Sequence, residues 1–250
     1  MKKVIYIGMP SGGHLSLEAA RGLFTSTART EYEIMPVAFS YSALASCFNH
    51  LWSRAIAASP EKVTHFAMLH SDVGPECGWL DTLMDELEAK KLDMVSAVIP
   101  IKSQDGLTST AVGEIKDPWK QKRLTMREVS ELPPTFTDDD LVEWKKKHKR
   151  EDSKLLLNTG CWLADLKNDT WRQMSDEGEL RFFFRTLDRI RVTDDNLEVD
   201  FAPEDWLFSR ECQAAGLKIG ATSKVKLKHF GAMGWDNQGV WGNLEEDRVP

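Results

Sequence analysis

The sequence predicts an α/β fold in which a mixed, mostly parallel central sheet is flanked by helices in a single domain. The chain has 250 residues, which is long enough for one large domain. In the first hundred residues, short apolar runs alternate with segments whose apolar residues recur at helical spacing. Because strand–helix alternation implies right-handed crossovers between parallel strands, the sheet is expected to be largely parallel.

The elements of this first part are delimited by their residue patterns. Strands are predicted where apolar residues are continuous, and helices where they recur every three to four positions. The predicted strands are Val4–Ile7, Ile34–Phe39, His65–Leu69 and Met94–Ile99, and the predicted helices are Leu15–Phe24, Ser42–Ala58 and Trp79–Lys90.

The pattern changes after residue 100. A segment rich in Thr, Ser and Val, Gly106–Ile115, predicts a hairpin. Further on, the acidic run Asp138–Asp140 precedes the basic run Lys145–Arg150, which favours a short exposed helix with its charges aligned to the helix dipole. The remaining predicted elements are strands at Leu155–Leu157, Cys161–Ala164 and Lys218–Leu227, a helix at Glu204–Ala215 between Pro203 and Gly216, and a loop or lid from Gly231 onward.

Composition argues against several classes of protein. The formal net charge of −7 disfavours a general electrostatic grip on nucleic acid or on an anionic membrane, although a local basic patch is compatible with it. The four cysteines are far apart, which indicates buried reduced thiols rather than a zinc knuckle or a disulfide framework. The first apolar run is too short for a signal peptide, and no stretch approaches the ~20 apolar residues of a membrane helix. A cytoplasmic protein without a membrane span is therefore expected.

Two polar residues stand after predicted strands and could ligate a cation. Asp72 follows His65–Leu69, at a strand end where ligands bind in open α/β sheets and where a carboxylate can hold a hard divalent cation. His229 follows the alternating stretch Lys224–Lys228, and a neutral imidazole can coordinate a metal. Taken alone, the plainer roles are favoured, namely a turn-capping aspartate and a surface histidine.

Two further segments could act on a ligand. Glu204 and Asp205 lie in the first turn of a predicted helix, where the dipole keeps a carboxylate ionised and ready to act as a base; acids there also simply stabilise the helix. The small residues of Pro10–His14 let a ligand approach the backbone, and the helix N-terminus that follows can attract phosphate. The spacing of Pro10–His14 is neither that of G-x-G-x-x-G nor that of a Walker loop, and a tight strand-to-helix turn explains it equally well.

Several short motifs follow one another in a definite order. They are Pro10 after the first strand, Asn49 on a helix, His70-Ser71-Asp72, Gly78-Trp79-Leu80, Asn158-Thr159-Gly160-Cys161-Trp162, Pro203-Glu204-Asp205-Trp206 with Ser209-Arg210, Ala215-Gly216-Leu217-Lys218-Ile219, and finally His229. This order resembles that of nucleotide-sugar glycosyltransferases with the GT-A fold, especially the family-2-like group. The resemblance covers about residues 4–231.

The resemblance implies a metal-dependent nucleotide-sugar site. His70-Ser71-Asp72 stands where the family carries its Asp-x-Asp motif, so Asp72 is expected to ligate Mn²⁺ or Mg²⁺. His229 stands where several members place a further metal ligand. His70 replaces the first Asp, which usually contacts the ribose or base, and differs from it in charge and hydrogen bonding.

The resemblance also implies roles for the other residues. Asp205 stands where inverting members place their catalytic base, with Glu204 beside it. Arg54 is expected to replace an arginine that the family often carries just before the position of Asn49, where this chain has Ser46-Cys47-Phe48. The nucleotide sugar is expected to contact Pro10, Ser11, His14, Asn49, Arg54, His70 and Ser71.

The expected reaction moves a sugar from a nucleoside-diphosphate sugar to an acceptor hydroxyl. A cation held by Asp72 and His229 would stabilise the charge on the leaving β-phosphate, and Asp205 would take the proton of the attacking hydroxyl. We expect inversion; in a retaining enzyme Asp205 would position the substrate or stabilise charge instead. The acceptor remains open between a glycan, a small molecule and a modified nucleic acid base, and the oligomeric state is also open.

The same resemblance suggests how the chain is divided. Residues 1–231 are expected to form the glycosyltransferase domain, with the nucleotide-sugar half at 1–100 and the acceptor and catalytic half at 101–231, followed by a loop or lid at 232–250. The basic run Lys145–Arg150 could touch an anionic acceptor or, more plainly, be a solvated helix end. Candidates for stacking on sugar or base, each of which could equally pack in the core, are Trp162, Trp206, Trp235 and Trp241.

Two other functions remain open. A nucleotidyltransferase acting on a sugar phosphate would normally carry Arg and Lys in a glycine-rich run after its first strand, and Ser11–His14 lacks such cations. A non-catalytic nucleotide-sugar-binding protein of the same fold would be favoured by loss of the acid or the histidine, whereas Asp72, Asp205 and His229 are all present.

Overall fold

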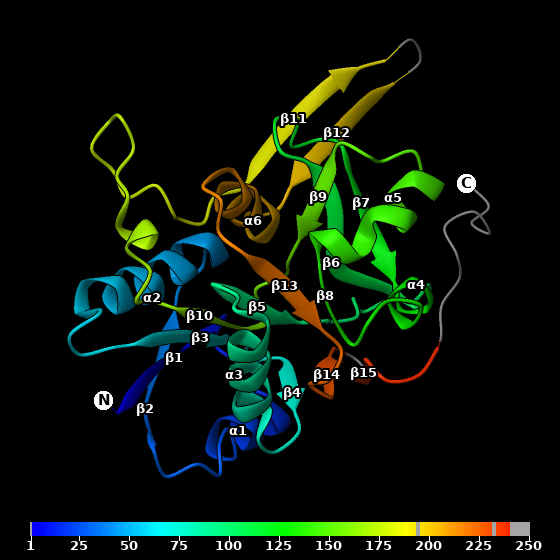
Figure 1. The fold of residues 1–250 in the computed structure, drawn as a ribbon. Coiled ribbons are helices and arrows are strands. Elements are labelled where there is room, and N and C mark those ends of the chain that lie inside the picture. Colours follow the sequence, from blue (N-terminus) through cyan, green and yellow to red (C-terminus); the bar gives the residue numbers. More distant parts are fainter. Residues whose placement is uncertain (1, 194–195, 232–233, 241–250) are drawn as a thin grey trace.

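The computed structural model describes residues 2–193, 196–231 and 234–240 (Figure 1). The seven strands of its central sheet are, in spatial order, β2 (Tyr32–Ser40), β1 (Lys3–Ser11), β3 (His65–Leu69), β10 (Cys161–Asp165), β5 (Met94–Ala97), β13 (Ile219–Thr222) and β8 (Thr135–Thr137). β1 pairs in parallel with β2 and β3, and β5 with β13, whereas β10 and β8 run antiparallel to their neighbours. The predicted α/β fold with a mixed, mostly parallel central sheet in one domain is confirmed.

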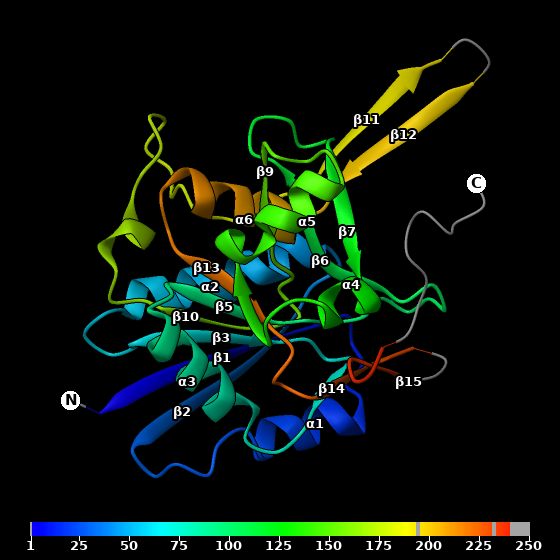
Figure 2. The same cartoon turned by 45° about the vertical axis from the view of Figure 1, so that its right-hand side comes forward.

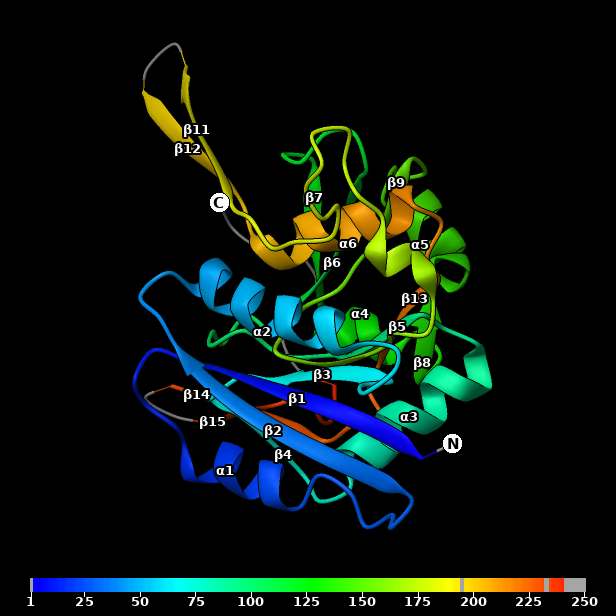
Figure 3. The same cartoon turned by 90° about the vertical axis from the view of Figure 1, so that its left-hand side faces the viewer.

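Helices cover both faces of the central sheet (Figure 3). On one face lie α2 (Leu44–Ala58) and α6 (Glu204–Ala214), and on the other lie α1 (Leu17–Phe24) and α3 (Trp79–Lys90). Successive strand residues point to opposite faces, so each strand serves two cores. In β3, Phe66 and Met68 pack into the core under α2 and α6, whereas Ala67 and Leu69 pack into the core with α3.

The core under α2 and α6 is rich in aromatic rings. Phe208 of α6 stacks on Phe184 with ring centroids 4.3 Å apart and meets Trp52 of α2 edge-on at 5.6 Å. All three rings are buried. This contact between the two helices holds the N-terminal end of α6 in a fixed place relative to the sheet.

Replacing Phe208 by Ala is expected to lower the free energy of unfolding by about 3–5 kcal/mol, because a buried ring is lost and a cavity remains. Urea denaturation measures this change. Phe24 is 86% exposed, so Phe24→Ala is a matched control expected to stay within about 0.5 kcal/mol of the wild type. If Phe208→Ala changed the free energy of unfolding as little as the control does, the close packing of this ring would be contradicted.

Smaller elements surround the central sheet. One three-stranded sheet has the order β15 (Gly234–Asp236), β14 (Leu227–Phe230), β4 (Val73–Pro75), and the other has the order β7 (Gln121–Thr125), β6 (Leu107–Glu114), β9 (Ser153–Leu156). The short helices are α4 (Met126–Ser130), α5 (Val142–Lys147) and the 3₁₀ turns η1 (Asp138–Leu141) and η2 (Asp169–Arg172). None of the helices within the described ranges is long and apolar enough to cross a bilayer.

Two predicted elements of the second half are wrong. The hairpin expected over Gly106–Ile115 is the single strand β6, whose partners β7 and β9 come later in the chain. The strand expected over Lys218–Leu227 is two strands in different sheets, β13 and β14. Between them the Asn237 side chain binds the backbone at Val225 and Leu227, which turns the chain out of the central sheet.

Two further segments differ from their predictions: the tail from Gly231, predicted as a loop, and the charged segment Asp138–Arg150, predicted as an exposed helix. β15 is a strand within the tail, while residues 232–233 and 241–250, including Trp241, lie outside the described residues. The helix predicted between the acidic and basic runs is present as η1 and α5. Lys145 of α5 is nevertheless buried, 3.0 Å from Asp138 Oδ2, so part of the basic run forms an internal ion pair.

A hairpin of β11 (Leu187–Val192) and β12 (Leu197–Ala202) was not predicted from the sequence. It projects from the body of the protein beside α6 (Figure 2). The chain passes from β12 directly into α6. The base of the hairpin therefore lies close to the start of α6, which carries Glu204 and Asp205.

Candidate functional site

The segment His70–Asp72, which follows β3, is held between two sheets. The backbone N–H of His70 donates to Gly160 O at 2.8 Å, just before β10. The carbonyl of Asp72 accepts a hydrogen bond from Phe230 N, also at 2.8 Å, at the end of β14. Because β4 then pairs antiparallel with β14, Asp72 and His229 are brought side by side from distant parts of the sequence.

The Asp72 carboxylate has two cationic or potentially cationic neighbours. Its Oδ2 lies 2.6 Å from Lys102 Nζ and 3.4 Å from His229 Nε2. Burial alone would raise the pKa of Asp72, but the hydrogen bonds and charges of His229 and Lys102 outweigh it and hold the pKa well below its ordinary value. Asp72 is therefore ionised at neutral pH.

The tautomer of His229 follows from its other ring nitrogen. Nδ1 lies 2.9 Å from the carbonyl of Pro100, which can only accept, so Nδ1 carries the proton. The hydrogen bond and charge that His229 gives to Asp72 require a proton on Nε2 as well, 3.4 Å from Asp72 Oδ2. A cation bound between these two atoms would take the place of that proton, with the Nε2 lone pair and the carboxylate oxygen as its ligands.

His70 is a neutral imidazole beneath this pair. Burial lowers its pKa to about 4. Its ring packs against Phe48 with centroids 4.9 Å apart, and its Nε2 has no hydrogen-bond partner among the described residues. A buried polar atom without a partner is costly, which makes this nitrogen a candidate to receive a hydrogen bond from a ligand or water, or to donate one.

One small cavity brings four of the sequence-predicted site residues together. Its volume is about 60 Å³, and it is lined by His70, His229, Glu204, Asp205 and the turn Asn158–Gly160, among others. The turn is shaped by its own side chain, because Asn158 Oδ1 accepts from Gly160 N at 3.1 Å and Asn158 Nδ2 donates to Ala97 O at 2.6 Å.

The carboxyls of Glu204 and Asp205, at the start of α6, line the same cavity as His70 and His229. Burial, and then the charge of Glu204, raise the pKa of Asp205 well above its ordinary value, and burial also raises the pKa of Glu204. Asp205 Oδ1 accepts from Trp206 N at 2.8 Å, and Trp206 Nε1 donates to Ser109 O at 2.8 Å. The helix start is thus fixed to β6.

Two basic residues at the site were not predicted from the sequence. Lys102 pairs with Asp72, as described above. The guanidinium of Arg123, in β7, lies 4.5 Å from the ring centroid of Trp206, and its charge opposes the rise in the Asp205 pKa. Neither residue belongs to a recognisable motif; the only available signal was the position of Lys102 shortly after a strand-ending proline.

Five of the residues predicted to bind the nucleotide lie away from the small cavity: Pro10 and Ser11 at the end of β1, His14 in the loop after it, and Asn49 and Arg54 on α2. His70 lines the cavity, and Ser71 follows it in the chain. Ser11 Oγ accepts from Gly13 N and donates to His14 O, both at 3.0 Å, so the loop after Pro10 is held in a turn, and His14 is exposed. This loop adjoins the strand-end segment, because Ser16 N donates to Ser71 O at 2.8 Å.

Asn49 and Arg54 lie farther along α2. The Asn49 amide binds both backbone groups of Phe184, with Nδ2 and Oδ1 each at 2.7 Å, so it fixes a distant segment to α2. The exposed Arg54 lies 5.6 Å from the ring centroid of Phe39 in β2, and Phe39 in turn contacts His50. The Asn49 side chain, predicted to bind the nucleotide, thus holds the backbone of Phe184 in the structure.

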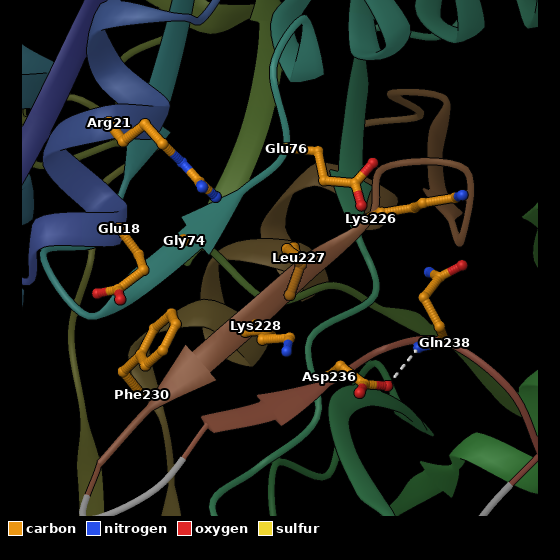
Figure 4. Close-up of a pocket in the computed structure, with 10 residues that line it drawn as sticks. All are labelled: Glu18, Arg21, Gly74, Glu76, Lys226, Leu227, Lys228, Phe230, Asp236 and Gln238. Carbon is orange, nitrogen blue, oxygen red and sulfur yellow. Dashed lines mark hydrogen bonds between the residues drawn. The ribbon is translucent and has the colours of Figure 1, made fainter.

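A second hollow lies on the outer side of the β4–β14 pair (Figure 4). It has a volume of about 350 Å³ and places Glu18 and Arg21 of α1 opposite Phe230 and Lys228 of β14. None of the predicted site residues lines it. His229 lies between Lys228 and Phe230 in β14 and faces Asp72, on the inner side.

Within the described residues, no group of three or more His, Cys, Asp or Glu side chains is arranged to hold a metal ion. No protein-family model and no curated protein matches this chain. Among solved structures, the chain is similar to the crystal structure of S. aureus TarS, with a TM-score of 0.45 and 9% sequence identity over 90% of this chain and 35% of that chain. The chain thus spans about a third of the length of that protein.

Proposed function

We propose that the chain is a metal-dependent glycosyltransferase that moves a sugar from a nucleoside-diphosphate sugar to an acceptor hydroxyl. The observation that carries this proposal is the convergence of His70, His229, Glu204 and Asp205 on one cavity at the carboxyl ends of the parallel strands, with Asp72 beside His229. Ligands bind in open α/β sheets at this edge. The order of motifs in the sequence points to the same class.

The metal would be held by Asp72 and His229. Ligands about 2.1 Å from a Mg²⁺ or Mn²⁺ ion stand roughly 3 Å apart when adjacent, and the two facing atoms are 3.4 Å apart. Such ions commonly take only one or two protein ligands and complete their shell with water and substrate phosphates. When bound, the ion supplies positive charge to the leaving diphosphate. Lys102, now paired with Asp72, is free to bind a phosphate oxygen once the ion takes its place.

Asp205 would act as the base of an inverting transfer. Its raised pKa makes it a stronger base than an exposed aspartate, and it lines the same cavity as His229. The nucleotide-sugar half, residues 1–100, would contribute His70 and Asp72, and the acceptor half, residues 101–231, would contribute Asp205 and His229. His70 would contact the donor through its partnerless Nε2.

Arg123 would keep part of the Asp205 population ionised. Replacing Arg123 by Gln removes the charge that lowers the Asp205 pKa, so the pKa rises further. Because the base must be deprotonated, the acidic limb of the kcat/KM–pH profile is expected to move to higher pH. Arg123→Lys retains the charge and serves as the control. An unshifted limb in Arg123→Gln would show that Arg123 does not influence the base.

Mass spectrometry of the products of a donor-and-acceptor screen tests the proposed reaction. Nucleoside-diphosphate sugars are combined with glycans, small alcohols and nucleic acids that carry hydroxymethylated bases, with Mn²⁺ present. A product heavier than its acceptor by one sugar residue is expected for at least one combination, together with release of the nucleoside diphosphate. Transfer of a nucleotide to a sugar phosphate instead would overturn the proposal in favour of a nucleotidyltransferase.

A further inference from the structure

The β11–β12 hairpin has one apolar face. In its antiparallel register Ile190 pairs with Val199, and Val192 pairs with Leu197. Phe201 lies two residues beyond Val199 and therefore points to the same side, where its cross-strand partner Asp188 places one carboxylate at the base of the hairpin. The five apolar side chains, called the apolar face below, are between 50% and 83% exposed. No other part of the described chain covers them.

The opposite face of the hairpin is charged, and it contacts the body of the protein at its base. Arg189 and Arg191 both pair with Asp200, at 2.7 and 2.5 Å, and Arg191 also pairs with Glu198 at 2.6 Å. The guanidinium of Arg189 lies 4.5 Å from the ring centroid of Trp119. The charged face thus meets the body where Arg189 lies over Trp119, and the five apolar side chains of the other face stay exposed.

An isolated two-stranded hairpin is at best marginally stable in water, and this one extends well beyond the body in all three views (Figures 1, 2 and 3). The exposed fractions of the five apolar side chains correspond to roughly 500 Å² of apolar surface, near the upper end of what monomers expose. An apolar face of this size is typical of a surface that is buried in an interface.

We propose that the apolar face of a second copy of this chain covers it, so that two hairpins pack face to face about a two-fold axis. If each face is fully covered, the two bury roughly 1,000 Å² together, which is about the least area expected of a biological interface. A single apolar patch that contacts its own copy is what two-fold symmetry requires. This inference is independent of the proposed reaction.

The charges of the hairpin favour a second copy over a membrane surface. Residues 187–202 carry two cations, Arg189 and Arg191, against five acids, Asp188, Asp194, Asp195, Glu198 and Asp200. Anionic lipid head groups attract segments rich in Lys and Arg and repel a segment with this balance.

Sedimentation equilibrium of the full chain tests the interface. The wild type is expected to be dimeric at micromolar concentrations. The double variant Ile190→Asn/Val199→Asn, which changes one cross-strand pair of the apolar face, is expected to raise the dimer dissociation constant by at least about 100-fold. The matched control Arg191→Asn/Glu198→Asn changes the neighbouring pair on the charged face and is expected to stay within about threefold.

Cross-linking keeps the test valid if the double variant unfolds the hairpin. In a Cys77→Ser background, which removes the exposed native thiol, Val199→Cys is expected to form a disulfide-linked dimer on oxidation, whereas Glu198→Cys is not. A wild type that stays monomeric up to ~100 μM overturns the proposal. A monomer that binds vesicles of anionic phospholipid would also overturn the proposal. So would a chain that dimerises only after truncation at Val240, because the tail would then be what covers the apolar face.

Discussion

Replacing Asp205 by Asn is expected to lower kcat for sugar transfer by about 10²–10⁴-fold, because the acceptor hydroxyl loses the group that takes its proton. KM for the donor is expected to change little, since Asp205 is proposed to act on the acceptor and is not among the residues proposed to hold the metal or the nucleotide. Steady-state kinetics measure both values. Glu211→Gln, which removes a carboxylate of the same helix that pairs with Arg181, is the control and is expected to retain full activity.

The stability of the Asp205→Asn protein separates a catalytic loss from a folding loss. The folded protein raises the pKa of Asp205 above its ordinary 3.8, so deprotonation costs stability as pH rises through that range. Asparagine is neutral at every pH and bears no such cost. The variant should therefore melt at the same temperature as the wild type or higher at pH 7, and full transfer activity in it would rule out Asp205 as the base.

Replacing Asp72 by Asn is expected to abolish metal-dependent donor binding, with the affinity for the Mn²⁺–donor complex lowered by more than about 100-fold. The carboxylate is the only anionic group beside His229 Nε2 that the structure describes in contact with it. Calorimetric titration with and without Mn²⁺ measures the effect. Asp105→Asn removes an exposed carboxylate near Lys102 and should bind donor as the wild type does.

In the metal-free protein, the contribution of Asp72 to stability is expected to depend on pH. The folded state holds the pKa of Asp72 below its ordinary 3.8, so its pairing with His229 and Lys102 stabilises the fold above that pH and is lost as pH falls. The difference in melting temperature between wild type and Asp72→Asn should therefore shrink on acidification toward pH 3. A difference that is independent of pH would mean that the Asp72 charge does not matter for the fold.

Much of the fold could be predicted where a segment is buried on all sides. The bounds of β3 and α3 coincide with the predicted His65–Leu69 and Trp79–Lys90, because continuous burial and helical spacing leave one interpretation. Lys218–Leu227 failed because its alternation continues through the turn between two sheets. The β11–β12 hairpin escaped prediction because its apolar face is not covered by the same chain, so no core pattern surrounds it.

The site could be predicted in part for a similar reason. Asp72, Asp205 and His229 stand at ends of regular elements, which sequence patterns can place. Lys102 and Arg123 reach the same cavity region only through the pairing of strands far apart in sequence. Asn49 shows the reverse case: a polar residue with a functional expectation whose amide is occupied by the backbone of Phe184.

The measurement that most directly tests the account is calorimetric titration of a panel of nucleoside-diphosphate sugars into the wild-type protein, with Mn²⁺ present and absent. We expect at least one donor to bind in the presence of Mn²⁺, to be displaced by its own nucleoside diphosphate, and to lose affinity when Mn²⁺ is removed. Absence of binding by every donor, under both conditions, would contradict a nucleotide-sugar site at Asp72 and His229.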